Sequence, residues 1–238
     1  MRTARFGAVL AGALIALSAS ACSATTSSRN IRTAGLVALV DVTARDDQHA
    51  TVSTSIVIGG ASSNTYVVLE GGDRLYAETN GDKREMNATS DGEYEAKFDR
   101  AEGEYLVSLA RDVDAAAPKS SGTLPPPFQI TSEFGDTPLS RKKDSVTFTW
   151  TPGNSGADVE ISIEGDCIHS EHYNVGGDPG TFTIEPKKIE AWKSEKKKAC
   201  NVTAEIIHTT RGSTDPAFDS DSRFQLRQVR TTRFVSGP

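Results

Sequence analysis

The sequence contains few of the residues on which most enzyme chemistry depends. Its 238 residues include only four histidines and three cysteines. It has no G-x-S-x-G nucleophile elbow, no H-E-x-x-H zinc motif, no phosphate-binding P-loop and no glycine-rich dinucleotide fingerprint. Because these common catalytic arrangements are missing, the sequence favours a protein that is not an enzyme and that uses no cofactor.

An excess of positive charge is also missing. The chain has 26 Lys and Arg against 32 Asp and Glu, a formal net charge of −6. Without Arg2 and Arg5, which belong to the leader described next, 24 basic residues face 32 acidic ones and the net charge is −8. A dedicated nucleic-acid-binding protein needs a basic surface to neutralise phosphates. The composition therefore argues against nucleic acid as a partner.

Long hydrophobic runs are missing except near the N-terminus, where an apolar stretch extends from Phe6 to Leu17. This stretch is shorter than the roughly 20 residues that a membrane-spanning helix needs. Arg2 and Arg5 precede it and small residues follow it, which is the pattern of a secretory signal peptide. We expect residues 1–21 to be such a signal peptide.

The end of this leader, Ala19-Ser20-Ala21-Cys22, resembles the lipobox of bacterial lipoproteins. The resemblance implies that the Cys22 thiol receives a diacylglyceryl group and becomes the first residue of the mature chain. Ser23 resembles the residue that sorts lipoproteins to the outer membrane of Gram-negative bacteria. Ala19 stands where Leu is usual, and its pattern also suits the ordinary secretory peptidase, so simple secretion is the alternative.

The three cysteines are consistent with lipidation. An odd number of cysteines in an exported protein needs an explanation. Lipidation of Cys22 leaves Cys167 and Cys200 as an even pair, and an oxidising compartment permits a disulfide between them. Residues 22–34 are mostly small or polar, so we expect a flexible tether there.

Two β-rich regions follow the tether. Residues 35–113 contain short runs rich in Val, Ile, Thr and Tyr, bounded by Gly, Asp and Asn, which is typical of an antiparallel sandwich. Residues 114–127 combine Ala, Ser and Gly with three consecutive prolines, so we expect a semi-rigid linker. With residues 128–235, the pattern predicts an all-β protein of two antiparallel β-sandwich domains.

The second region alternates apolar and polar residues along several expected strands. Val146, Phe148 and Trp150 share a strand face, and Thr151-Pro152 ends that strand. Three further sets are in phase, namely Val159, Ile161 and Ile163; Val202, Ala204, Ile206 and His208; and Phe224, Leu226 and Phe234. The Trp, the Thr-Pro pair and the alternating next strand resemble a fibronectin type III or immunoglobulin-like module over residues 128–235.

This resemblance implies a disulfide. In such modules the third and sixth strands are antiparallel neighbours. Cys167 follows the expected third strand, and Cys200 begins the expected sixth strand, where such modules usually have a tyrosine. We therefore expect a disulfide between Cys167 and Cys200.

The densest group of candidate metal ligands is Cys167, His169 and His172, next to two acidic residues. Such side chains can bind zinc or copper. On a strand, however, His169 and His172 would point to opposite faces, and Cys167 is the expected disulfide partner. We expect two exposed loop histidines, and a metal site at His169 and His172 is the alternative.

A second candidate cation site contains Asp215, Asp219 and Asp221. Calcium takes carboxylate oxygens as ligands, but the spacing does not match an EF-hand loop. We expect an acidic surface loop.

A cluster of lysines surrounds Trp192. Its members are Lys187, Lys188, Lys193, Lys196, Lys197 and Lys198. The segment could form a short helix with Ile189 and Trp192 on one side. Clustered lysines are attracted to anionic lipids or polyanions. The alternative, which the sequence favours, is a solvated connection with Trp192 packed into the core.

The last expected strand carries four arginines, Arg223, Arg227, Arg230 and Arg233. Charged residues on an edge strand prevent edge-to-edge aggregation. We therefore expect this strand at the edge of its sheet.

These observations favour a cell-envelope lipoprotein, anchored to a membrane through Cys22, with a non-catalytic binding or scaffolding role. Its partner would be another envelope protein, and its ligand is unknown. One alternative is a metal-binding envelope protein that uses His169 and His172. Another is an accessory hydrolase with a site between the domains, for which the sequence identifies no residues.

Overall fold

The structure is a computed structural model that describes residues 24–238. The expected signal peptide and Cys22 lie outside the described residues. Apart from two short 3-10 turns, every regular element in residues 24–238 is a β-strand, which confirms the predicted all-β sandwich fold. No helix of this range is long and apolar enough to cross a membrane.

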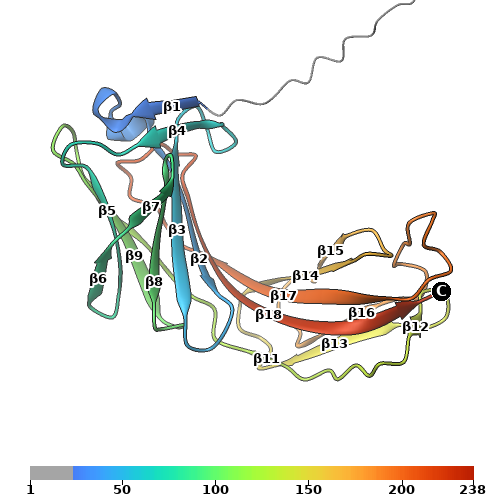
Figure 1. Cartoon of the computed structure of the whole chain (residues 1–238). Coiled ribbons are helices and arrows are strands. Elements are labelled where there is room, and N and C mark those ends of the chain that lie inside the picture. Colours follow the sequence, from blue (N-terminus) through green and yellow to red (C-terminus); the bar gives the residue numbers. More distant parts are fainter. Residues whose placement is uncertain (1–23) are drawn as a thin grey trace, which may run out of the picture.

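Two clusters of buried hydrophobic side chains divide the molecule into two lobes (Figure 1). The first lobe surrounds a cluster drawn mainly from Leu36 to Leu124. The second lobe surrounds a cluster drawn from Phe128 to Phe234. One sheet of eleven strands contributes a layer to both lobes, and a smaller sheet completes each sandwich.

In the first lobe, one layer contains strands β1 (Ala24–Ser27), β2 (Val37–Ala44), β3 (Ala50–Val57), β4 (Thr65–Val68), β7 (Asn87–Ser90) and β8 (Glu93–Phe98). The other layer contains β5 (Arg74–Thr79), β6 (Asp82–Glu85), β9 (Glu104–Ala110) and β10 (Ala117–Thr123). Alternation along β9 buries Tyr105, Val107 and Leu109 between the layers. Asn80 and Gly81 adopt positive φ angles of 48° and 80° in the tight turn that joins β5 to β6.

In the second lobe, the shared sheet contributes β12 (Leu139–Ser140), β14 (Asp158–Gly165), β15 (Glu171–Asn174), β17 (Cys200–Arg211) and β18 (Arg223–Gly237). The small sheet contains β11 (Gln129–Ile130), β13 (Val146–Thr151) and β16 (Thr181–Ile184). The aromatic side chains of Phe148, Trp150 and Phe234 fill the space between them. The predicted inward faces of β13, β14 and β17 are buried, including His208.

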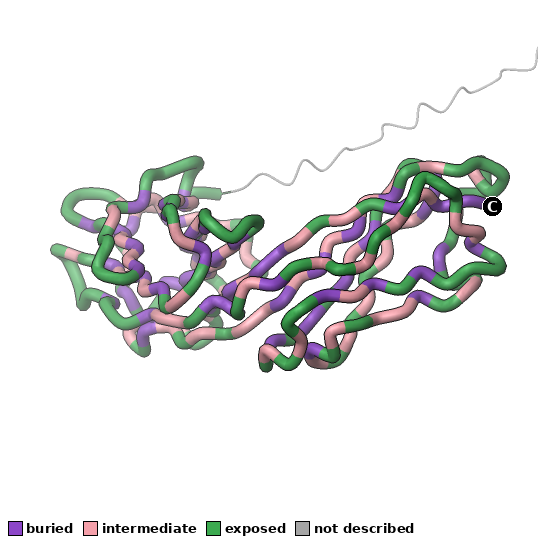
Figure 2. Tube along the Cα trace, turned by 90° about the horizontal axis from the view of Figure 1, so that it is seen from below, coloured by how far each residue is buried: buried purple, intermediate pink, exposed green. Residues whose placement is uncertain are grey.

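The long strand β18 belongs to both lobes (Figure 1), and Figure 2 shows buried residues in each of them. Its first six residues pair in parallel with β2, from Leu39 beside Arg223 to Ala44 beside Gln228. Residues 225–236 of β18 also pair antiparallel with the whole length of β17. Phe224 and Leu226 therefore enter the first core, whereas Phe234, on the same strand face, enters the second. The expectation of an edge strand is wrong, because β18 lies between β17 and β2.

The connection between β17 and β18 inserts into the first lobe. Phe218 is buried in the first core, and the backbone N–H of Asp219 donates to the carbonyl oxygen of Leu36 at 2.9 Å. Asp215 is also buried, and its carboxylate accepts hydrogen bonds from the backbone N–H groups of Lys119 and Ala217. The loop thus fastens the end of the β17–β18 hairpin to the first lobe.

The linker expected at residues 114–127 is wrong for residues 117–123, which form β10 against β9. Small residues allow this strand to approach the β17–β18 hairpin closely. A Cβ atom on Gly122 would lie 2.5 Å from Leu226 Cδ1 and 2.9 Å from Gly212 Cα. The Ala, Ser and Gly residues that suggest a linker are therefore the ones that permit close packing.

The flexible tether expected at residues 22–34 is wrong for residues 24–34. Strand β1 pairs in parallel with β4, and 3-10 turns at Ser28–Asn30 and Thr33–Gly35 follow it. Arg111 and Asp73 form a fully buried ion pair at 3.1 Å, and Arg111 also donates to the carbonyl oxygens of Ser28 and Ile31. A long-range contact therefore orders a segment whose own composition gives no sign of it.

Candidate binding surface

The disulfide between Cys167 and Cys200 closes the outer end of the second lobe. Strands β14 and β17 are antiparallel neighbours, and their register ends with Gly165 beside Val202. The two cysteines follow and precede these positions, and their Cα atoms lie 5.8 Å apart. The bond confirms the pairing implied by the module resemblance. The bond joins the two ends of the segment 167–200, which includes the lysine cluster.

The lysine cluster forms no helix. Turns occupy residues 186–187 and 193–197, so the short helix that the segment could have formed is absent from it. The backbone N–H of His169 donates to the carbonyl oxygen of Glu190 at 2.9 Å, and Ile168 pairs with Ala191. This pairing holds the segment against the end of β14 and buries Ile189 in the second core.

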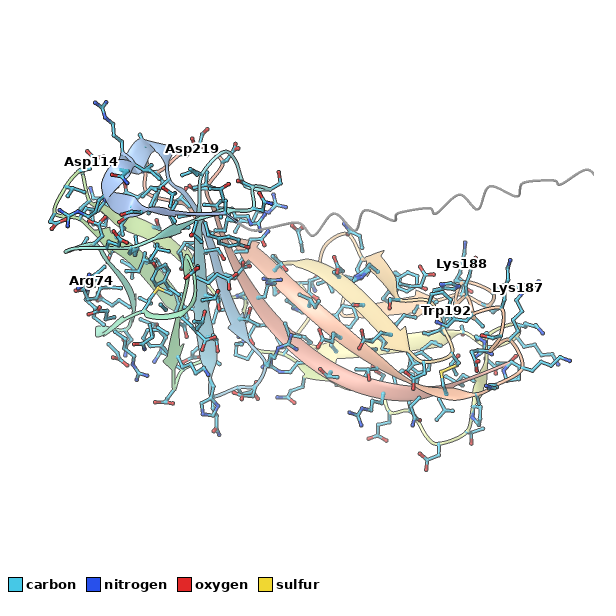
Figure 3. The ribbon with its side chains drawn as sticks, turned by 45° about the horizontal axis from the view of Figure 1, so that its top comes forward. Arg74, Asp114, Lys187, Lys188, Trp192 and Asp219 are labelled. Atoms are coloured by element: carbon cyan, nitrogen blue, oxygen red, sulfur yellow. A yellow bond between two sulfur atoms is a disulfide. The ribbon has the colours of Figure 1, made fainter. Side chains whose placement is uncertain are left out.

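Trp192 projects from this segment to the surface, so the expectation that it packs into the core is wrong. Its side chain is 46% exposed, and Val113 is the other large hydrophobic residue this exposed in residues 24–238. One partner covers part of the indole: the ring of His169 lies 3.7 Å away, centroid to centroid. Figure 3 shows Trp192 with Lys187 and Lys188 at the outer end of the second lobe.

We call this region the lysine-rich tip. It comprises Trp192 and eight exposed lysines, which are Lys142, Lys143, Lys187, Lys188, Lys193, Lys196, Lys197 and Lys198. The first two come from the turn between β12 and β13, so the structure adds them to the group visible in the sequence. Among the described residues, the only carboxylate within ion-pair distance of any of these lysines is Glu195, at 2.8 Å from Lys198. Segments 141–144 and 185–198 together contain nine basic residues and four acidic ones, Asp144, Glu185, Glu190 and Glu195, so the tip carries a net positive charge.

Arg141 supports the tip from beneath. It is only 7% exposed, and its guanidinium donates to the carbonyl oxygens of Lys196 and Lys198 at 3.3 and 2.9 Å. It also donates to Ser236 Oγ and approaches Cys167 Sγ. No carboxylate in residues 24–238 lies within ion-pair distance of it, and burial lowers its pKa. The sequence could not reveal this role, because the contacts span up to 95 residues.

A hollow of about 360 Å³ lies beside Arg141. Its lining includes Arg141, Lys142, Lys187 and Lys196, together with the single acidic side chain Glu190. Lys187 has a φ angle of 70°, in the left-handed region that side chains other than Gly and Asn rarely adopt. Its backbone N–H is held by the carbonyl oxygen of Arg141 at 2.6 Å. The fold thus maintains a strained backbone at a lysine that lines the hollow.

The expectation of two exposed loop histidines is correct only in part, because His169 is half-buried in a loop and the exposed His172 lies on strand β15. His169 lies against Trp192, while His172 is 3.2 Å from the carboxylate of Glu160. Cys167 is in the disulfide. Within residues 24–238, no group of three or more His, Cys, Asp or Glu side chains is arranged to hold a metal ion. That statement includes the loop with Asp215, Asp219 and Asp221.

One buried constellation contains the residue types of a serine hydrolase without the necessary connections. Asp178 accepts hydrogen bonds from Ser155 Oγ and Trp150 Nε1, both at 2.6 Å. His208 Nδ1 lies 3.8 Å from Asp178, and neither ring nitrogen of His208 has a hydrogen-bond partner in the structure. Its ring stacks on Phe128 at 3.9 Å. A nucleophile needs a hydrogen bond to its base, and Ser155 donates to the carboxylate instead.

The protonation states of this constellation follow from its burial. Burial lowers the pKa of His208 to about 4, with the charge of Arg230 acting in the same direction and that of Asp178 against it. Burial opposes ionisation of Asp178, but the hydrogen bonds from Ser155 and Trp150 hold the pKa of Asp178 below its usual value. His208 is therefore a neutral core residue at pH 7. The sequence prediction that it lies in phase with the core is correct.

The arginines of β18 have structural partners or lie on the surface. Arg227 forms an ion pair with Asp41, and Arg230 forms one with Asp47 while its guanidinium lies over the Phe128 ring. Both pairs link β18 to the first lobe. Arg223 and Arg233 are exposed.

Comparisons with known proteins assign no family to the chain. No protein-family model and no curated protein matches the chain. Among solved structures, the FN1–FN3 domains of chicken CNTN1 are similar at 11% identity and a TM-score of 0.30, over 84% of this chain and 66% of that chain.

Two further structures are similar. One is a tetra-tandem repeat from the extending region of a large adhesion protein, at 14% identity and a TM-score of 0.22, over 84% of this chain and 49% of that chain. The other is a DUF3823 family protein from Bacteroides ovatus, at 12% identity and a TM-score of 0.22, over 83% and 97% of the two chains. The chain thus spans just under two thirds of the first of these structures and about half of the second. These likenesses concern the fold alone.

Proposed function

We propose that the protein is a cell-envelope lipoprotein with a non-catalytic binding or scaffolding role, and that the lysine-rich tip is its binding surface. In this proposal the lipid on Cys22 holds the first lobe near a membrane, and the partner is an envelope component. The observation that carries the proposal is the position of the tip. Trp192 lies at the outer end of the second lobe (Figure 3), whereas β1, which begins two residues after Cys22, belongs to the first lobe and lies beside β4 (Figure 1).

The fixed conformation of residues 24–35 supports a scaffolding role. Because β1 and the following turns are fixed to the first lobe, little free chain separates it from Cys22. The lobes are in turn joined by β17, β18 and the ion pair of Arg230 with Asp47. A lipid at Cys22 would therefore hold the whole molecule close to the membrane, with the tip on the second lobe.

Two experiments test the proposal. Incorporation of labelled palmitate that is lost in Cys22→Ala would establish the anchor, and absence of label from the wild type would leave a secreted protein. A photo-crosslinking amino acid at position 192, in cells, should give an adduct. The same probe at Val113, which is 44% exposed on the first lobe, is the matched control. Equal adducts at both positions would contradict a binding role for the tip.

A further inference from the structure

We propose that the lysine-rich tip binds a linear polymer that carries repeated phosphate groups, one of which occupies the hollow beside Arg141. This inference rests on the proposed function, because it gives the chemistry of the ligand at the same surface. Lysine ammonium groups bind phosphate as compact point charges with rotatable donors. Lys142, Lys187 and Lys196 line the hollow and are free of carboxylate partners among the described residues.

The buried charge of Arg141 favours an anion at this place. A guanidinium removed from water without a carboxylate partner raises the positive potential in the adjacent hollow. Its terminal nitrogens already donate to carbonyl, hydroxyl and sulfur acceptors, so the lysines would contact the ligand directly. The lining contains four basic side chains against one acidic side chain, Glu190, and the carboxyl group of Pro238.

The extent of the charge favours a polymer over a single ion. The hollow is lined by three of the eight lysines, and the other five lie on the surface beyond it. A chain with one charge on each repeat can contact both groups at once and would release counterions along its length.

The surroundings of Trp192 favour a polymer over a membrane surface. The ring of His169 covers part of the indole, which leaves less apolar surface for contact with acyl chains. In the tethered protein, moreover, the anchor would adjoin β1 of the first lobe, whereas the tip belongs to the second lobe. The indole is better placed to pack against the backbone of a bound chain.

The test uses the mature protein and long-chain inorganic polyphosphate as the probe, with titration calorimetry at several salt concentrations. We expect binding whose logarithmic affinity falls linearly with the logarithm of salt concentration. Lys142→Gln with Lys196→Gln should weaken this affinity about 10-fold, since each lost contact near the hollow costs several-fold. The matched control, Lys97→Gln with Lys119→Gln, removes the same charge from the first lobe and should change the affinity less than about 2-fold.

Lys187→Gly separates binding from folding. Glycine adopts the observed φ of 70° without strain, so the variant should melt at a temperature equal to or up to about 4 °C above that of the wild type. The same variant should bind polyphosphate about 3-fold more weakly, because one lining charge is lost. Wild-type affinity in this variant and in the Lys142/Lys196 double variant would overturn the proposal.

Three comparison ligands identify the source of the anion. Monomeric inorganic phosphate should bind at least about 100-fold more weakly than the polymer. Equal affinity for poly-glutamate would overturn the assignment of phosphate. Binding to phosphatidylglycerol vesicles without binding to polyphosphate would replace the polymer with a membrane. An adduct at position 192 in cells, together with no polyphosphate binding, would leave the proposed function standing and remove this inference.

Discussion

The two lobes are both β-sandwiches, but they are assembled differently. Every buried side chain in the core of the second lobe lies in residues 128–234, and a disulfide closes its outer end. The first lobe takes Phe218, Phe224 and Leu226 from the far part of the chain and has no disulfide. A sandwich that looks like one continuous region of sequence can therefore depend on residues a hundred positions beyond its apparent boundary.

The most severe way to test this difference is to divide the chain at residue 127. Residues 24–127 alone should show no cooperative unfolding transition, because they lack three core side chains and the strand beside β2. Residues 128–238 alone should keep theirs, since that core is complete. Circular dichroism during urea titration measures both. A cooperative transition in residues 24–127 would show that the first lobe is independent.

Two substitutions on β18 sharpen the comparison. Phe224→Ala and Phe234→Ala remove equally buried aromatic side chains from the same strand face, one in each core. Each should lower the free energy of unfolding by about 3–5 kcal/mol. Hydrogen exchange should then rise mainly in β2 and β3 for Phe224→Ala and mainly in β13 and β14 for Phe234→Ala. Identical exchange patterns would mean that the lobes unfold as one unit.

The disulfide should matter to one lobe only. Replacing both Cys167 and Cys200 with Ala opens a loop with a sequence separation of 33 and should cost about 3.5–4 kcal/mol in the chain-entropy model. Exchange should increase in β14, β17 and the lysine-rich tip, with β5 and β9 as internal controls in the first lobe. An equal increase in both lobes would contradict the assignment of the bond to the second.

The smallest of these effects concerns pH. The folded pKa of His208, about 4, lies below the ordinary value of 6.5, so the unfolded chain binds a proton first as pH falls. The contribution of His208 to the free energy of unfolding is therefore fully present above pH 6.5. It decreases by about 2–3 kcal/mol as the pH falls to 4. Urea titrations of the wild type and His208→Leu at pH 7 and pH 4 give the difference. The same loss in both would assign it to other titrating groups.

Local patterns predicted most strands, but they missed β1 and β10 and could not identify the partners of the strands. Alternation correctly identifies the buried faces that contain Tyr105, Phe148 and Ile161, because side-chain direction in a strand repeats every two residues. The same alternation places Phe224 and Phe234 in phase but cannot show that they enter different cores. The disulfide was predictable because a module resemblance supplied the strand neighbours.

The errors share a physical cause. Residues 24–34 and 117–123 have the small and polar composition of flexible chain, yet the buried Arg111–Asp73 pair orders the first segment and close packing at Gly122 orders the second. For the lysine-rich tip, the sequence revealed the charge. It could not reveal that Trp192 is exposed or that Arg141 supports the loop, since both depend on contacts between distant segments.

The parallel pairing of β18 with β2 has a consequence for the order of events during biosynthesis. A ribosome completes residues 36–124 long before it makes residues 218–228. Until then the core of the first lobe lacks its last side chains, and β2 lacks its partner strand β18. Contacts this distant along the chain also slow folding. The usual sequence, in which an N-terminal unit folds as it emerges, is thus prevented by the topology. For a chain that we propose is exported, the delay would keep the first lobe in the unfolded form that a narrow translocation channel requires.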